Sequence, residues 1–144
     1  MSDIPPGLAL NNPGDIERDG DTFHYQGEVV PSSHPVLREF YNVTWGLRAI
    51  LEDLLTYIVR DGVQTLGAAV ERWAPPTEND TAAYQAAMCG ACHAVNQTAF
   101  TVAFLQANAE AMLDTITQRE VGVVFPAAVT GAAIDLMTWP EEHV

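Results

Sequence analysis

Lysine is absent from this sequence of 144 residues, and 6 arginines stand against 19 acidic residues, which gives a formal net charge of −13. A surface of this charge repels phosphate backbones, so we expect no nucleic-acid partner. No apolar run approaches the roughly 18 residues that a membrane-spanning helix needs, so we expect no membrane span. The first residues lack the basic and apolar regions of a secretory signal, and we expect a product of the cytoplasm.

Cysteine is scarce, and both cysteines lie in Cys89–His93 (CGACH), which matches the attachment pattern of c-type haem. Haem attachment normally takes place in an exported compartment and needs a loop that wraps around the porphyrin. This stretch instead has the residue spacing of an amphipathic helix, and a disulfide within a helix is geometrically poor. We therefore interpret both cysteines as reduced, packed thiols.

Metal-binding patterns are also absent from the sequence. The other histidines are scattered and give no second pair of ligands at zinc-binding spacing: His24, His34 and His143. An acidic turn lacks the spacing and closing glutamate of an EF-hand loop: Asp15, Glu17, Asp19 and Asp21. We expect no metal and no cofactor.

Turn-forming residues are frequent in the first part of the chain. The run Asn11–Asp15 (NNPGD) is a turn signal in several registers, because proline presets φ and glycine or asparagine tolerates positive φ. Short extended pieces are indicated around Gly27. We predict a loop-rich lobe over residues 1–34 that holds at most a small hairpin.

Helical periodicity dominates residues 35–144. The clearest apolar stripe runs from Leu47 to Ile58, in a helix that Thr44 would cap and Gly62 would end. Further helices are predicted over about 65–73, from about 81, over about 98–119 with Asn108 as a candidate break, and from about Pro126. Val95 is expected to point inward from the helix that begins at about 81, and Leu136 from the helix that begins at about Pro126. The prediction is a mainly α chain that folds as one domain over residues 1–144.

Carboxylates are the remaining candidates for chemistry, since no nucleophile elbow, P-loop or dinucleotide fingerprint is present. Glu120 is expected at the C-terminal end of a long helix, beside Val121 and Val123. The negative end of a helix and apolar neighbours both raise a carboxylate pKa, as a glycosidase general acid requires. The alternative is a solvated glutamate at a helix end. Glu28 is a second carboxylate in an apolar setting, although no spacing links it to Glu120.

Two stretches resemble the signatures of a family of small phage and prophage virion proteins: Asn11–Ile16 (NNPGDI) and Arg72–Tyr84 (RWAPPTENDTAAY). The stretch Trp45–Ala49 (WGLRA) matches the family's helix signature. Arg119–Gly122 (REVG) resembles the signature near the C-terminal end of the family, which is less specific. The resemblance covers residues from about 11 to 135. These signatures are remotely similar to those of lysozyme-like glucosaminidases, which implies a lysozyme-like helical domain.

The resemblance implies a structural protein of a phage particle (tail, hub or capsid-associated), with other virion proteins as partners and the virion as its location. The alternative that it implies is a peptidoglycan glycan-strand hydrolase or lytic transglycosylase used in host entry or lysis. In that alternative Glu120 is the general acid, and Glu28 or an N-terminal aspartate is the second catalytic group. The residues expected to bind the sugar are Tyr25, Trp73, Asn79 and Tyr84.

The sequence departs from the lysozyme-like pattern in two ways. In that class the catalytic glutamate precedes the asparagine turn by a helix, whereas no glutamate precedes Asn11 here. A permuted arrangement, in which the helix that ends at Glu120 replaces the missing one, would restore the acid. In addition, Asp15 stands where the family usually has a second asparagine, and Phe23–Tyr25 (FHY) stands where a tryptophan is expected. These departures favour a structural or degenerate member.

A third alternative, an intracellular regulator that binds a host protein, has no specific feature in its favour.

Overall fold

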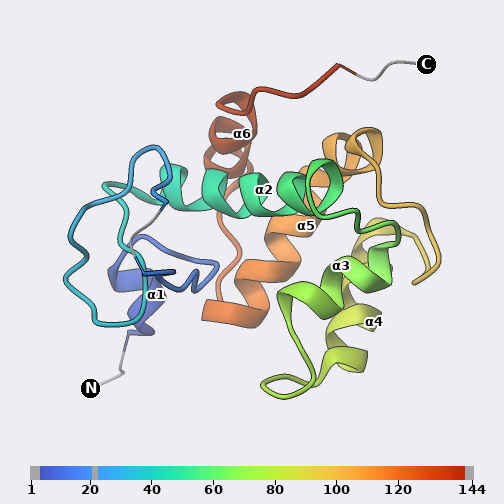
Figure 1. Cartoon of the computed structure of the whole chain (residues 1–144), viewed down its shortest axis with the longest axis horizontal. Helices are drawn as coiled ribbons and strands as arrows, with labels where there is room; N and C mark the ends of the chain where they lie inside the picture. Colours follow the sequence, from blue (N-terminus) through green and yellow to red (C-terminus); the bar gives the residue numbers. More distant parts are fainter. Residues whose placement is uncertain (1–3, 21–22, 142–144) are drawn as a thin grey trace.

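Residues 4–20 and 23–141 are described by the computed structural model, and they form six helices joined by loops (Figure 1). The helices are α1 (Pro6–Ala9), α2 (Val43–Val59), α3 (Leu66–Trp73), α4 (Thr81–Cys92), α5 (Val102–Val121) and α6 (Ala127–Asp135). Extended pairing among the described residues is limited to isolated bridges. The prediction of a mainly α fold is confirmed. Two residues named in the sequence analysis, Asp21 and His143, lie outside the described part.

Helix α2 crosses the molecule and packs against α5 and α6 (Figure 1). Its predicted apolar stripe is almost fully buried, at Leu47, Ile50, Leu51 and Leu54. Burying one aliphatic side chain of this size contributes about 1.5–3 kcal/mol, so the stripe fixes the orientation of the helix. The cap is Asn42 rather than the expected Thr44, because the Asn42 side chain accepts a hydrogen bond from the Trp45 N–H at 3.1 Å.

Two side chains that were expected to point inward are exposed, because their helices end earlier than the apolar spacing suggests. Helix α4 ends at Cys92, where His93 adopts a left-handed conformation with φ of 52°, and Val95 beyond it is 60% exposed. Helix α6 ends at Asp135, and Leu136 is 41% exposed. The expected break at Asn108 is present as non-helical φ and ψ angles within α5.

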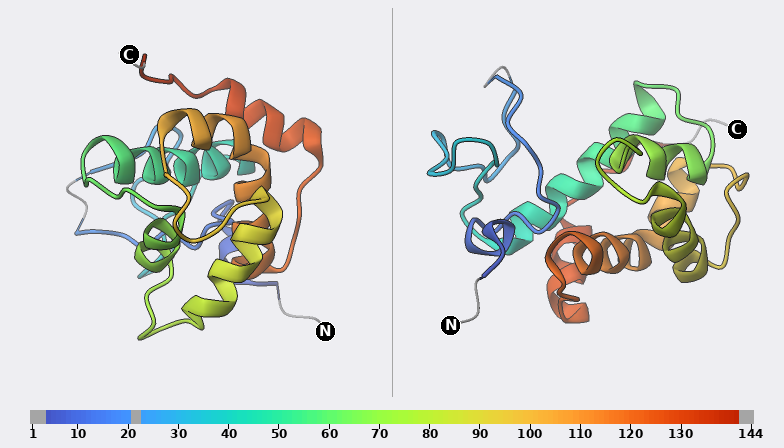
Figure 2. Two further views of the ribbon diagram at one scale, coloured as in Figure 1. Left: turned by 90° about the vertical axis from the view of Figure 1, so that its right-hand side faces the viewer. Right: turned by 90° about the horizontal axis from the view of Figure 1, so that it is seen from below.

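The first part of the chain forms an irregular N-terminal lobe, which comprises the described residues up to Asn42. Instead of a hairpin, isolated antiparallel bridges join Glu17 to Leu37 and Glu28 to Phe40. The irregular segment therefore continues past residue 34, up to the start of α2. The N-terminal lobe lies at one end of α2, and α3 and α4 lie at the other, with the C-terminal end of α5 reaching α1 (Figure 2).

The buried side chain of Asn12 holds the turn of this lobe. Its amide nitrogen donates to the carbonyl oxygens of Ile16 and Arg38, both at 2.9 Å, and its amide oxygen accepts from the Ile16 N–H at 3.0 Å. The residue is 0% exposed, so water does not reach these groups. The Asn12 side chain thus joins the asparagine turn to the segment that contains Arg38.

Replacing Asn12 with alanine should lower the free energy of unfolding by about 2–4 kcal/mol, because it leaves buried backbone groups without partners. Urea denaturation measures the change. Gln106→Ala serves as the control, since Gln106 is exposed on α5, and it should change stability by less than about 0.5 kcal/mol. A loss in the Asn12 variant as small as in this control would contradict the role of Asn12.

Candidate functional site

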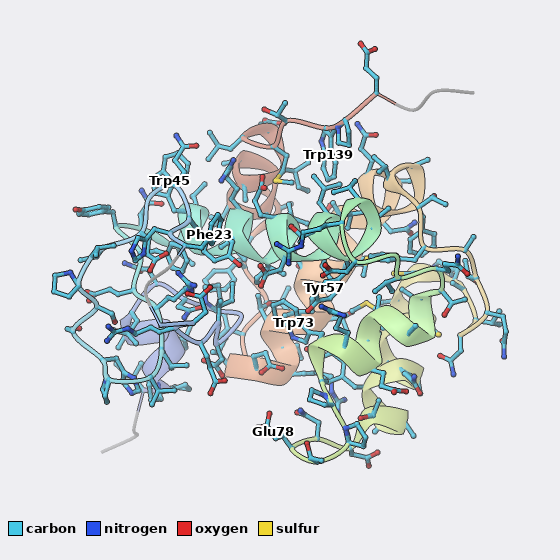
Figure 3. All side chains as sticks on the ribbon, viewed as in Figure 1. Phe23, Trp45, Tyr57, Trp73, Glu78 and Trp139 are labelled. Carbon is cyan, nitrogen blue, oxygen red and sulfur yellow. The ribbon has the colours of Figure 1, made fainter. Side chains whose placement is uncertain are left out.

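A cleft of about 600 Å³ opens between the N-terminal lobe and the helices. We call it the acidic cleft, because carboxylates make up much of its lining. Its lining residues are Pro6, Gly14, Asp15, Ile16, Glu17, Asp19, Tyr25, Leu37, Arg38, Asp53, Tyr57, Trp73, Glu78, Asn79 and Glu120. Figure 3 labels Tyr57, Trp73 and Glu78, which reach this region from α2, α3 and the loop that follows α3. Residues far apart in the sequence therefore share one open cavity.

The acidic cleft brings together most of the site residues that the sequence suggested. Tyr25, Trp73, Asn79 and Glu120 line it, and the Tyr84 hydroxyl donates a hydrogen bond to Glu120 Oε2 at 3.0 Å. These residues come from the N-terminal lobe, α3, the loop between α3 and α4, α4 and α5. Their spatial grouping is a finding of the structure, whereas their roles in catalysis and sugar binding stay predictions.

Glu120 is half-buried in the last turn of α5, directly before the residue that ends the helix. Burial raises the pKa of its carboxyl group above the ordinary value, and the charge of Asp15 raises it further. Hydrogen bonding by Tyr84 and Trp73 and the charge of Arg119 act in the opposite direction without reversing the shift. The carboxyl group therefore keeps its proton to higher pH than an ordinary glutamate.

The loop between α3 and α4 fixes one rim of the acidic cleft. Pro75 ends the run of helical backbone after Trp73, and the Thr81 hydroxyl donates back to the carbonyl oxygen of Ala74 at 2.7 Å. At the other end of the loop, the Asp80 side chain caps α4 by accepting from the Ala83 N–H. These local bonds hold Asn79 in place at the cleft.

Sequence reasoning missed Asp53 and Tyr57, which line the acidic cleft from α2. The Tyr25 hydroxyl donates a hydrogen bond to Asp53 Oδ1. Burial raises the pKa of Asp53 to about 6, although this hydrogen bond and the charge of Arg38 lower it. The available signal was the spacing of four residues between Asp53 and Tyr57, which places both on one face of a helix.

Glu28 is not among the residues that line the acidic cleft. Its side chain is 3% exposed and both carboxylate oxygens are engaged. Oε1 accepts from the Arg38 guanidinium at 2.7 Å and from the Tyr25 N–H at 2.9 Å, while Oε2 contacts His24 at 3.3 Å. The structure thus gives Glu28 a place in the interior of the N-terminal lobe and does not pair it with Glu120.

The two cysteines, Cys89 and Cys92, are free thiols on α4, and burial raises the pKa of both. Thiols with raised pKa are poor nucleophiles and metal ligands at neutral pH. Across the described residues, no group of three or more histidine, cysteine or acidic side chains is arranged to hold a metal ion. None of the helices there is long and apolar enough to cross a membrane.

Comparison with known proteins points to a bacteriophage. No protein-family model matches the chain. Over 85 residues it is 37% identical to Protein P5 of Pseudoalteromonas phage PM2, and this match covers 58% of the chain. The matched part is 53% of Protein P5, so the chain spans about half the length of this relative. The similarity supports the prediction that the chain is a phage protein.

The raised pKa of Asp53 makes stability depend on pH in a defined direction. Asp53 has a pKa of about 6 in the folded protein, against an ordinary value of 3.8, so the folded state binds the proton more tightly. Stability is therefore lost as the pH rises from about 4 to above 6, by about 3 kcal/mol for a shift of this size. Asp53→Asn removes this loss while its amide oxygen still accepts from Tyr25. We expect the variant to gain stability relative to the native chain over that pH range.

Urea denaturation at pH 4 and pH 7.5 tests this expectation. Asp135→Asn is the matched control, because Asp135 is exposed on α6 and does not line the acidic cleft, and it should change stability by less than about 0.5 kcal/mol at either pH value. If the difference in unfolding free energy between Asp53→Asn and the native chain does not grow with pH, burial of the Asp53 charge does not lower stability.

Proposed function

We propose that the chain is a component of a phage particle and that its acidic cleft binds and cleaves the glycan strands of peptidoglycan. The observation that carries the catalytic part is Glu120, a half-buried carboxyl group with a raised pKa that lines an open cleft. A glycosidase general acid must hold a proton at neutral pH and still reach a substrate from solvent. The raised pKa of Glu120 shifts its carboxyl group toward the first condition, and its place in the open cleft meets the second.

In the proposed reaction Glu120 donates its proton to the oxygen of the glycosidic bond. The Tyr84 hydroxyl holds the carboxyl group through Oε2, which orients the acid. As the bond breaks, positive charge develops on the sugar, and carboxylates around the cleft stabilise that charge: Asp15, Glu17, Asp19, Asp53 and Glu78. Glu120 itself becomes an anion that burial disfavours, so it readily regains a proton.

The walls of the acidic cleft suit a polysaccharide. Tyr25, Tyr57 and Trp73 offer aromatic faces against which the apolar faces of sugar rings pack, and the Asn79 amide can both donate to and accept from hydroxyl groups. Charged and polar side chains make up much of the lining of the cavity, which suits a ligand rich in hydroxyl groups. The same acidity repels anionic parts of a cell wall, so we expect binding to strengthen with moderate salt.

The phage-particle part of the proposal rests on the similarity to Protein P5 of phage PM2 and on the surface of the N-terminal lobe. Several large apolar side chains there are about half exposed or more: Ile4, Phe23, Val30, Val36 and Tyr41. Such residues suit contact with other proteins of a particle. The same exposed apolar side chains favour a second candidate function, a purely structural role in which the acidic cleft binds no glycan.

Glu120→Gln should reduce release of muropeptides from purified peptidoglycan by at least about 100-fold, because glutamine cannot donate the proton. Its melting temperature should be no lower than that of the native chain, since the amide oxygen still accepts from Tyr84 and a charge that burial disfavours is removed. Mass spectrometry of the soluble products measures release. The matched control is Glu110→Gln, which changes an exposed glutamate on the same helix and should leave release unaltered.

Retained activity in the Glu120 variant would exclude Glu120 as the acid. No release by the native chain at any pH or salt concentration would exclude hydrolysis and leave the structural role.

The particle assignment predicts that the protein copurifies with virions at a fixed stoichiometry. Quantitative mass spectrometry across a density gradient of purified particles measures this ratio. A cytoplasmic host protein of similar size provides the control for trapping. A protein that is made during infection but separates from the particles would contradict the assignment.

A further inference from the structure

Asp15 is a carboxylate that lines the acidic cleft. Among the described residues, no hydrogen bond or ion pair is formed by its side chain, and it lines the same cavity as Glu120. Its charge acts on Glu120, since Asp15 is the carboxylate that raises the Glu120 pKa. The fold thus places Asp15 in the same cleft as the proposed acid, and no side-chain hydrogen bond or ion pair among the described residues engages the Asp15 carboxylate.

The backbone holds Asp15 in an unusual conformation. Its φ is 51°, in the left-handed region that aspartate tolerates better than most residues, and its N–H donates to the Asn12 carbonyl oxygen at 3.1 Å. The next residue, Ile16, is fixed by the Asn12 side chain. Both sides of Asp15 are therefore tied to the buried asparagine.

Close packing also restricts the Asp15 side chain. A Cβ atom added at Gly7 would lie 2.1 Å from Asp15 Oδ1 and 3.0 Å from a methyl carbon of Val121. The Asp15 carboxylate therefore lies against α1, on the side where α1 meets the end of α5. That end of α5 also carries Glu120. Only glycine at position 7 leaves room for this approach.

We infer that Asp15 is the second catalytic carboxylate of the acidic cleft, the base that takes a proton from the water that attacks the sugar. This inference rests on the proposed hydrolysis. The bond between the anomeric carbon and the glycosidic oxygen breaks, and the leaving oxygen keeps the electron pair and receives the Glu120 proton. The water oxygen bonds to the anomeric carbon, and its proton passes to Asp15. The product is a reducing-end sugar, and solvent returns the proton from Asp15 to Glu120.

The other carboxylates of the region are less suited to this role. Asp53 accepts a hydrogen bond from Tyr25, and Asp19 forms an ion pair with Arg38 at 2.9 Å. Glu28 is held by the same arginine. Glu17 and Glu78 are exposed to solvent, and neither contributes to the raised pKa of Glu120. Burial also raises the pKa of Asp15, which makes it a stronger base than an ordinary aspartate.

Asp15→Asn tests the inference cleanly, because asparagine tolerates the left-handed conformation and has the same shape. Release of reducing-end sugars from purified peptidoglycan should fall at least about 100-fold. The melting temperature should be no lower than that of the native chain, because the variant removes a charge that burial disfavours. Asp15→Gly also fits this conformation and opens space for an added nucleophile. Azide needs no deprotonation, so it should restore cleavage by Asp15→Gly and yield a glycosyl azide that mass spectrometry detects. A merely structural role for Asp15 would not give this product.

Asp135→Asn is the control, with activity equal to that of the native chain. Full activity in Asp15→Asn, alongside an inactive Glu120→Gln, would overturn the role of Asp15 and leave the proposed function standing. Anhydro ends as the main native product would also overturn it, because an internal hydroxyl would then attack in place of water. No release by the native chain would overturn the proposed function and this inference together.

Discussion

The buried guanidinium of Arg38 is the group on which the N-terminal lobe depends. Its side chain is 3% exposed, and it donates to the Glu28 carboxylate and to the carbonyl oxygens of Glu17 and Phe23. A buried cation costs several kcal/mol unless such partners surround it. The partners come from separate loop segments, so satisfying the charge of Arg38 also holds these segments together. Apart from the short helix α1, the described residues of the lobe form only isolated bridges.

This lobe forms one wall of the acidic cleft and connects to the helices through Tyr25. Arg38 lies 5.0 Å from the centre of the Tyr25 ring, and Glu28 accepts from the Tyr25 N–H. The Tyr25 hydroxyl then reaches Asp53 on α2. A chain of polar contacts therefore runs from the interior of the lobe to the helical part, and Glu28 contributes to the site by positioning Tyr25.

Local signals in the sequence were enough to predict α2 to α6 apart from the ends of α4 and α6, but they missed the short helix α1, and the cleft required tertiary contacts. The stripe around Leu47 and the break at Asn108 follow from spacing and side-chain chemistry within one segment. Glu120 could be singled out because a helix end acts on it locally. Arg38 gives no such local signal, because an arginine among loop residues looks solvated until distant segments cover it. The spacing that places Asp53 on one helix face with Tyr57 does not show that this face lines a cleft. The resemblance located Trp73 and Asn79, and the fold supplied their common cavity.

Among the described residues, the carboxylates whose pKa is shifted differ in what surrounds them. Asp61 has a lowered pKa because Arg60 and Arg72 surround it, so its charge favours the folded state. Asp15, Asp53 and Glu120 have raised pKa values because burial disfavours their charge, and all three line the acidic cleft. Burial also raises the pKa of Asp114 on α5, which does not line this cleft. Each of these anions reduces stability near neutral pH. Three such groups in one cavity are difficult to explain by folding alone, since amides or apolar residues would fit there at lower cost. Groups that weaken a fold and meet in one cleft are typical of sites where chemistry requires them.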